Sequence, residues 1–132
     1  MEISRNFNQL NFHDASIEFV KRDVDRIEVS FDYVIVAPDH PDARGEVIEL
    51  RNAMVTFSHF KSERALIWHD DKSPIEHPNP NAPVSEVMHG TQKEDYIHFD
   101  GFWQPDDWSE WYIYADSFVV NGRPTEFTRA AF

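Results

Sequence analysis

The chain contains no cysteine among its 132 residues. This absence excludes disulfide bonds, catalysis by a thiol and zinc sites built on cysteine, and it fits a cytoplasmic protein. Glycine is also scarce, with four residues in all. The sequence therefore offers no glycine-rich loop of the kind that cradles phosphate groups.

Long hydrophobic runs are missing as well. No stretch approaches the ~20 apolar residues that a membrane-spanning helix needs. The first residues, "MEISRNFNQLNFHDAS", show no basic segment followed by an apolar one, so they do not indicate a signal peptide. We expect a cytoplasmic protein that does not bind membranes.

Basic residues are outnumbered: 12 Lys and Arg stand against 24 Asp and Glu, giving a formal net charge of −12. A surface of this sign repels phosphate backbones and anionic membranes, so nucleic acid is not an expected partner. A basic protein, a cation or a neutral ligand is compatible with it. The charge could equally serve solubility alone.

Aromatic side chains, by contrast, are plentiful. Hydrophobic residues make up 41% of the chain and aromatic residues 14%, including 11 Phe and 4 Trp. Each large ring can bury ~150–250 Å² of surface, which is enough to build a substantial core. The length and composition predict one globular domain spanning residues 1–132.

Period-two alternation is the main structural signal. "RIEVSFDYVIVA" alternates apolar and polar residues, and it follows the shorter alternating run "ASIEFVK" across a predicted turn at Arg22 to Asp25. Residues 37–46 and the proline-rich residues 73–84 are predicted loops. No segment shows a helical period. The pattern predicts an all-β fold: an antiparallel β-sandwich or a partly open barrel of about seven to nine short strands, with little helix.

Three details of the strand pattern can be tested. The apolar phase changes between Leu50 and Val55, which predicts a bulge or turn near Asn52. A second turn is predicted at Lys61-Ser62. Asn121-Gly122 between apolar residues predicts a third, which would separate a short last strand.

Three of the four tryptophans lie in "GFWQPDDWSEWYIYAD", residues 101–116. Trp111 falls in a strand and is predicted to be core, as is Trp68. Trp103 and Trp108 flank the polar turn "QPDD". They are interpreted either as a lid over the edge of the sheet or as anchors for a sugar ring or a protein partner.

Motifs that carry chemistry are absent. The seven histidines form no metal-binding spacing, although His89 and His98 could be neighbours on paired strands. The acidic pairs do not match a calcium loop, and no nucleophile motif occurs. We therefore expect a non-enzymatic protein without a metal or cofactor. The predicted binding residues are Trp103, Asp106, Asp107, Trp108, Asp70 and Asp71.

The segment "NFHDASIEFVKRDVDRIEVSFDYV", with "VIELRNAMVTFSH" and "WYIYADSFVV", resembles small bacterial all-β domains, some of which are immunity proteins of toxin systems. The resemblance implies a non-catalytic protein that binds one partner, and many toxins are basic nucleases that an acidic surface would attract. Two alternatives stay open: a carbohydrate-binding module that uses Trp103 and Trp108, and a structural domain that forms a homodimer.

Overall fold

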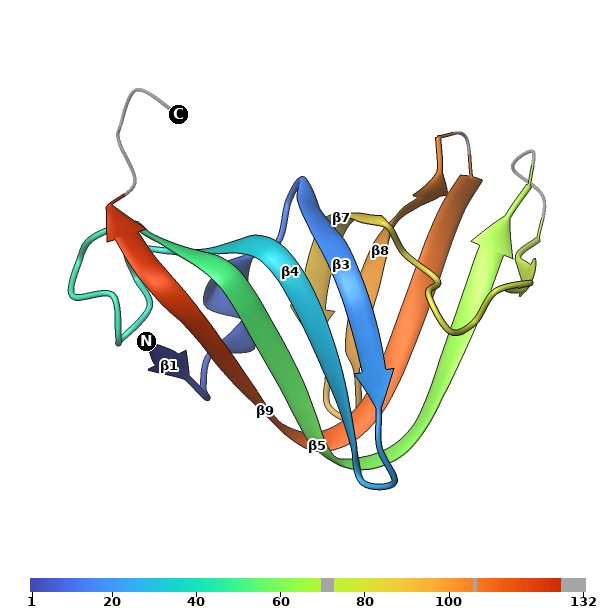
Figure 1. Cartoon of the computed structure of the whole chain (residues 1–132), viewed down its shortest axis with the longest axis horizontal. Coiled ribbons are helices and arrows are strands. Elements are labelled where there is room, and N and C mark those ends of the chain that lie inside the picture. Colours follow the sequence, from blue (N-terminus) through green and yellow to red (C-terminus); the bar gives the residue numbers. More distant parts are fainter. Residues whose placement is uncertain (70–72, 106, 127–132) are drawn as a thin grey trace.

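The computed structural model describes residues 1–69, 73–105 and 107–126 (Figure 1). Within these residues the chain forms nine strands and one short 3-10 helix. In chain order the elements are β1 (Glu2–Ile3), η1 (Phe7–Gln9), β2 (Leu10–Asn11), β3 (Ala15–Arg22), β4 (Arg26–Val36), β5 (Ile48–Trp68), β6 (Ile75–Glu76), β7 (Glu86–Gln92), β8 (Ile97–Gln104) and β9 (Asp107–Glu126).

Six of the strands close into an antiparallel barrel. β3 pairs with β4, β4 with β5, β5 with β9, β9 with β8, β8 with β7, and β7 returns to β3. Three short strands pair with barrel strands: β1 with β9, β2 with β4 and β6 with β5. The prediction of an all-β fold with seven to nine strands is confirmed, and the hairpin around Arg22 to Asp25 joins β3 to β4 as expected.

The two longest strands form the spine of the molecule. β5 has 21 residues and β9 has 20, and the two stay paired from Ile48–Glu126 to Trp68–Trp108 while both bend (Figure 1). One register shift lies between Arg51 and Met54, and Asn52 takes a positive φ of 50° there. This shift confirms the predicted bulge, because it lets Leu50 and Val55 both point inward.

The two other predicted turns are wrong. At Lys61 the pairing with β9 only shifts register, and β5 continues through it. At Gly122 the backbone φ is not positive, and β9 stays paired with β5. A Cβ at Gly122 would lie 2.8 Å from the Cβ of Leu50. This glycine therefore serves close packing between strands rather than a hairpin turn.

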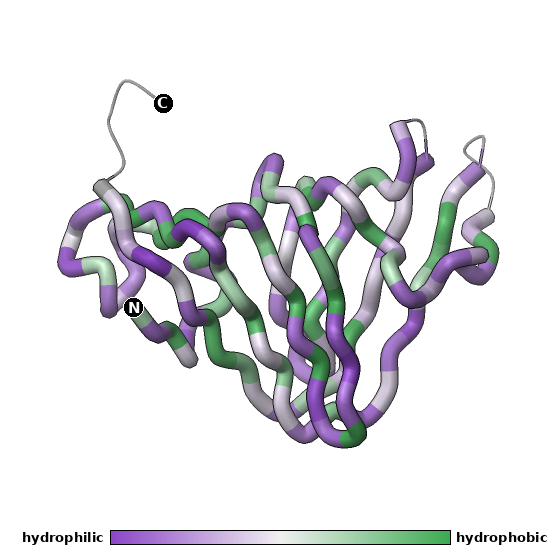
Figure 2. Tube along the Cα trace, viewed as in Figure 1, coloured by the Kyte–Doolittle hydropathy of each residue, from purple (hydrophilic) through white to green (hydrophobic). Residues whose placement is uncertain are grey.

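The core fills the barrel with aromatic rings. Phe99 on β8 is completely buried and lies with its ring centroid 5.3 Å from Phe12 and 5.6 Å from Phe31. Trp111 is also completely buried, as its sequence position predicted. Along the strands, hydrophobic residues alternate with hydrophilic ones (Figure 2), so each strand has an inner and an outer face.

The proline-rich residues 73–84 form the predicted loop, apart from the two residues of β6 that pair with β5. Hydrogen bonds hold the loop to β5 and β3. The backbone N–H of His77 donates to the carbonyl of Ala65 at 3.0 Å, and Arg22 donates to the carbonyls of Pro80 and Asn81. The loop thus runs from β6 to β7 and bridges β5 and β3 on its way (Figure 1).

Candidate functional site

The outer face of β8, β9 and β5 carries most of the aromatic side chains that do not enter the core. They alternate with the buried residues of the same strands, so Trp108, Tyr112 and Tyr114 point outward where Trp111 and Ile113 point inward. Each is partly exposed. This surface, called here the aromatic face, comprises Trp68, Tyr96, His98, Phe102, Trp108, Tyr112 and Tyr114.

At the upper end of this face three large rings form a row across three strands. Trp108 of β9 is the register partner of Phe102 on β8 and of Trp68 on β5. The rings of Phe102 and Trp108 meet edge to face, with centroids 5.2 Å apart and planes at 89°. Cross-strand aromatic pairs of this kind hold each other in place, so the row is a fixed surface rather than a set of mobile side chains.

Glu110 anchors the middle of the aromatic face. Its carboxylate accepts a hydrogen bond from the indole Nε1 of Trp68 at 2.8 Å and one from the hydroxyl of Tyr112 at 3.3 Å. The ring Nε2 of His98 lies 3.2 Å from the same carboxylate. The side chain of Glu110 is only 17% exposed, so these partners replace much of its hydration. The negative charge is thereby fixed between the aromatic rings.

A second carboxylate stands directly beside the first. Asp100 of β8 is the register partner of Glu110, and its Oδ1 lies 2.8 Å from Nδ1 of His89 on β7. The two strands β7 and β8 do pair, as the sequence suggested, but His98 stands opposite Thr91 rather than His89. Each histidine has its own carboxylate, so they do not share one site.

The electrostatics of the aromatic face follow from these carboxylates. The pKa of Tyr112 is raised above its usual 10.0, first by burial of the phenol and then by the charge of Glu110 and the hydrogen bond to it. The pKa of Tyr33 on the neighbouring β4 is raised in the same direction, first by burial and then by Asp14 and other acids that include Glu86. In both tyrosines burial is the larger cause of the raised pKa, and the neighbouring acids add to it.

The two loop tryptophans predicted as a pair are separated. Trp108 points outward into the aromatic face, whereas Trp103 lies at the rim of the barrel and packs edge-on against His77, with ring centroids 4.6 Å apart. Phe102 and Trp103 are consecutive in β8, so their side chains leave opposite faces of the sheet, and Phe102 is the one that shares the outer face with Trp108. The packing of Trp103 on His77 is compatible with the lid interpretation, and the role of either tryptophan as an anchor for a partner stays a prediction.

The predicted acids are only partly described. Asp107 is half-buried at the start of β9, with its carboxylate 3.6 Å from Nδ1 of His69. Asp70, Asp71 and Asp106 lie outside the described residues. Trp68, expected in the core, is instead partly exposed and belongs to the aromatic face.

Sequence reasoning missed Phe102, Glu110 and His98 as members of the site. Their signal was present in the parity of the strands: in β8 and β9 every second residue is buried, and the residues between are aromatic, acidic or histidine. The solvent-facing side of a barrel strand is commonly polar, so a group of aromatic residues on that side is unusual.

Two of the remaining histidines have structural roles in loops. His77 and His40 each precede a proline, in "HPN" and "HPD", and each ring nitrogen Nδ1 accepts the backbone N–H two residues later. Their Nε2 atoms lie 2.9 Å from the carbonyls of Pro83 and Arg5 respectively. Both rings are buried and engaged, so neither is free to bind a ligand.

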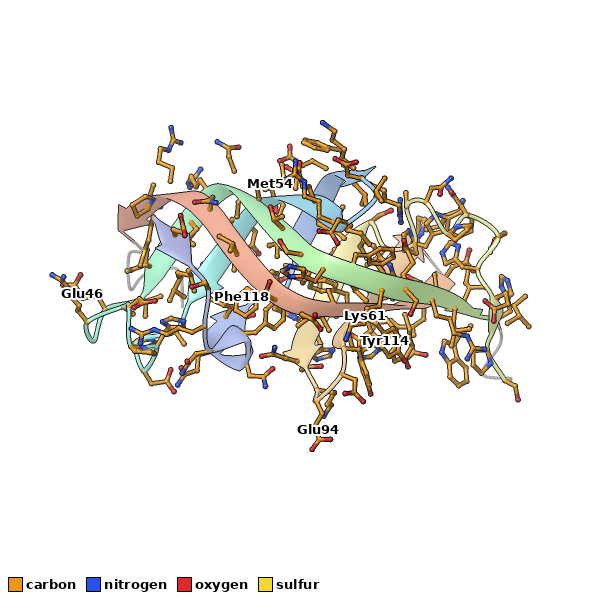
Figure 3. All side chains as sticks on the ribbon, turned by 90° about the horizontal axis from the view of Figure 1, so that it is seen from below. Glu46, Met54, Lys61, Glu94, Tyr114 and Phe118 are labelled. Carbon is orange, nitrogen blue, oxygen red and sulfur yellow. The ribbon has the colours of Figure 1, made fainter. Side chains whose placement is uncertain are left out.

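A hollow of about 390 Å³ adjoins the lower end of the aromatic face, at the turn between β7 and β8. Lys61 and Tyr114 lie next to each other on its wall, and Glu94 stands at the tip of the turn (Figure 3). Lys61 is paired with Asp116 at 2.8 Å. The hollow is lined by both lysines and acids, so it has no dominant charge that a ligand could complement.

Comparison with known proteins gives no assignment: no protein-family model, curated protein or solved structure matches the chain. Among the residues that the structure describes, no three His, Cys, Asp or Glu side chains are grouped so that they could hold a metal ion. In the same part of the chain, no helix has the length and apolar character needed to cross a membrane. The candidate site therefore has to be judged on its own geometry.

Proposed function

We propose that the protein is a non-catalytic, cytoplasmic binding protein whose aromatic face docks a basic protein partner. The observation that carries the proposal is the row of Trp68, Trp108 and Phe102 beside the fixed carboxylate of Glu110. Tryptophan and tyrosine are the residues that contribute most often to the energetic centre of a protein interface. A net charge of −12 would attract a basic partner and speed its encounter.

An immunity-type role is consistent with this proposal, and it rests on the resemblance of the sequence rather than on the geometry. A protein that blocks a basic nuclease would need a rigid acidic surface that competes with the phosphate groups of nucleic acid. The aromatic face meets that need, since its rings are held by cross-strand contacts and its acids are held by hydrogen bonds.

The geometry favours a protein partner over a polysaccharide. Stacking on a sugar needs a ring face that lies open, whereas His98 and Tyr112 stack on each other at 26° and the other neighbouring rings meet at steeper angles. Phe102 and Trp108 are at 89°, and Tyr96 is tilted 65° from Tyr112. Edge-to-face rings present an uneven surface that suits interdigitation with side chains.

The test is affinity capture of partners from a lysate of the source organism, at low and high salt, with the wild type and two variants. Trp108→Ala removes the centre of the row, and Phe19→Ala removes an aromatic ring that is 52% exposed on β3, away from the face. We expect a basic protein that the wild type and Phe19→Ala capture at low salt, that high salt releases, and that Trp108→Ala does not capture.

Two outcomes would contradict the proposal. One is capture that Trp108→Ala and Phe19→Ala weaken equally, which would place the interface elsewhere. The other is a partner that is retained at high salt and carries no excess of basic residues. Melting curves of both variants show whether a lost interaction reflects the surface or the fold.

A further inference from the structure

A groove of about 420 Å³ lies at the edge of the aromatic face, where β7 begins and β8 ends. Phe102, Trp103 and Glu86 line it, together with Ser85, Gln104 and Pro105. Glu86 is the register partner of Phe102, so the carboxylate and the ring stand on adjacent strands and on the same side of the sheet.

The carboxylate of Glu86 is exposed, and no Lys, Arg or His within the described residues forms an ion pair with it. Burial is the main cause of the raised pKa of Tyr33, and Glu86 is one of the acids that raise it further. The charge of Glu86 therefore adds to a negative region that extends toward β4. An aromatic wall with one unneutralised acid is the combination that attracts a cation, through the ring faces and the opposite charge together.

The protein already contains this combination inside the barrel, filled by its own arginine. The guanidinium of Arg22 lies 5.8 Å from the ring centroid of Trp111 and forms two hydrogen bonds, at 2.7 and 2.8 Å, with the carboxylate of Glu63. Trp103 and Glu86 provide the same two chemical groups in the lining of the groove, where no Lys, Arg or His of the described residues pairs with the carboxylate.

We infer that this groove is the seat for one arginine side chain of the partner, which would lie against Phe102 and Trp103 with its guanidinium paired to Glu86. The inference rests on the proposed function, because it names the chemistry by which the aromatic face holds a basic protein. Arginine fits better than lysine because its planar guanidinium can stack on a ring and bind a carboxylate with two parallel hydrogen bonds.

The experiment uses N-acetyl-arginine amide as the probe and the neutral, nearly isosteric N-acetyl-citrulline amide as its control. Each is titrated into the whole protein while the four tryptophan indole N–H signals are followed by NMR. We expect the arginine compound to shift the Trp103 signal in a saturable way and to leave that of buried Trp111 unchanged. The citrulline compound should bind about tenfold more weakly.

Glu86→Gln should weaken arginine binding about tenfold, whereas Glu94→Gln, a matched change at an exposed acid on the β7–β8 turn, should not. Equal binding of both probes, or full binding by Glu86→Gln with its melting curve intact, would overturn the inference. Partner capture that depends on Trp108 and not on Glu86 would also overturn it and leave the proposed function standing. If the arginine compound binds but no protein partner is captured, the arginine site stands and the proposed function does not.

Discussion

Arg22 of β3 and Glu63 of β5 form a bidentate, partly buried ion pair. Nε and Nη2 of the arginine donate to the two carboxylate oxygens at 2.7 and 2.8 Å, and the indole Nε1 of Trp111 donates to Oε1 at 3.0 Å. The same guanidinium holds the carbonyls of Pro80 and Asn81. A single carboxylate thus connects three strands, and through Arg22 it holds the loop of residues 73–84.

Glu63→Ala should therefore destabilise the fold by about 2–3 kcal/mol. The substitution leaves a largely buried guanidinium and the Trp111 indole N–H without their acceptor; the two charged side chains are 27% and 20% exposed. Chemical denaturation measures the loss. The matched control is Glu76→Ala, which breaks the exposed Arg64–Glu76 pair and should cost less than about 1 kcal/mol. Similar losses for the two variants would contradict the structural role of Glu63.

Gly101 of β8 and Gly122 of β9 make a second prediction. A Cβ at Gly101 would fall onto the backbone carbonyl of Glu86, and a Cβ at Gly122 would lie 2.8 Å from the Cβ of Leu50. We expect Gly122→Ala to cost about 1–3 kcal/mol, and Gly101→Ala to cost more because it must push β8 away from β7. Denaturation of both variants tests the order. A smaller loss for Gly101→Ala would mean that the two strands are not so closely spaced.

The strand content and its phase changes could be predicted from the sequence because burial repeats every second residue. The change in apolar phase between Leu50 and Val55 predicted an irregularity near Asn52, and the structure has a register shift at that place. Local turn signals were less reliable. Asn121-Gly122 has the residues of a hairpin turn, but the pairing of β9 with β5 and the close contact with Leu50 keep the chain extended.

The candidate site was only half predictable for a related reason. Trp103 and Trp108 look equivalent in the sequence, but Trp108 stands opposite Phe102, and Trp103 is the next residue of β8, so the two tryptophans lie on different sides of the sheet. This register depends on how the two strands pair. The same holds for Trp68 and Glu110, which are 42 residues apart in sequence and meet only because β5 pairs with β9.

The buried ring of His77 predicts a dependence of stability on pH. Burial lowers the pKa of His77 below its usual 6.5, and its Nδ1 is already occupied as the acceptor of the Asn79 N–H. The unfolded chain therefore takes up this proton at a higher pH than the folded one. The contribution of neutral His77 is present above about pH 6.5 and is lost as the pH falls through the lower folded pKa.

Denaturation of the wild type between about pH 7.5 and about pH 5.5 should show this loss, with a slope from this group of at most ~1.4 kcal/mol per pH unit. His77→Gln should lower stability at neutral pH and flatten the slope. His59→Asn is the control, because this exposed residue has a positive φ of 55° that asparagine tolerates. If both variants keep the wild-type slope, His77 is not the group responsible.

Glu110→Gln tests whether the carboxylate organises the aromatic face. The amide keeps the shape but carries no charge, and its nitrogen cannot accept the bonds that Trp68 and Tyr112 now donate. We expect a loss of about 1–2 kcal/mol in stability and a changed NMR shift for the Trp68 indole N–H. The pKa of Tyr112 should fall toward its usual 10.0, since the charge that opposes the phenolate is gone, while burial still holds it above that value.

The tyrosine absorbance measured during an alkaline titration follows this change directly. Glu94→Gln again serves as the control, because Glu94 is exposed and is not among the groups that shift the pKa of Tyr112. A tyrosine that titrates at the same pH in Glu110→Gln as in the wild type would show that the two side chains are not coupled. Rigid presentation of Trp68 and Tyr112 to a partner would then need another cause, since Glu110 is the charged group that the structure places between them.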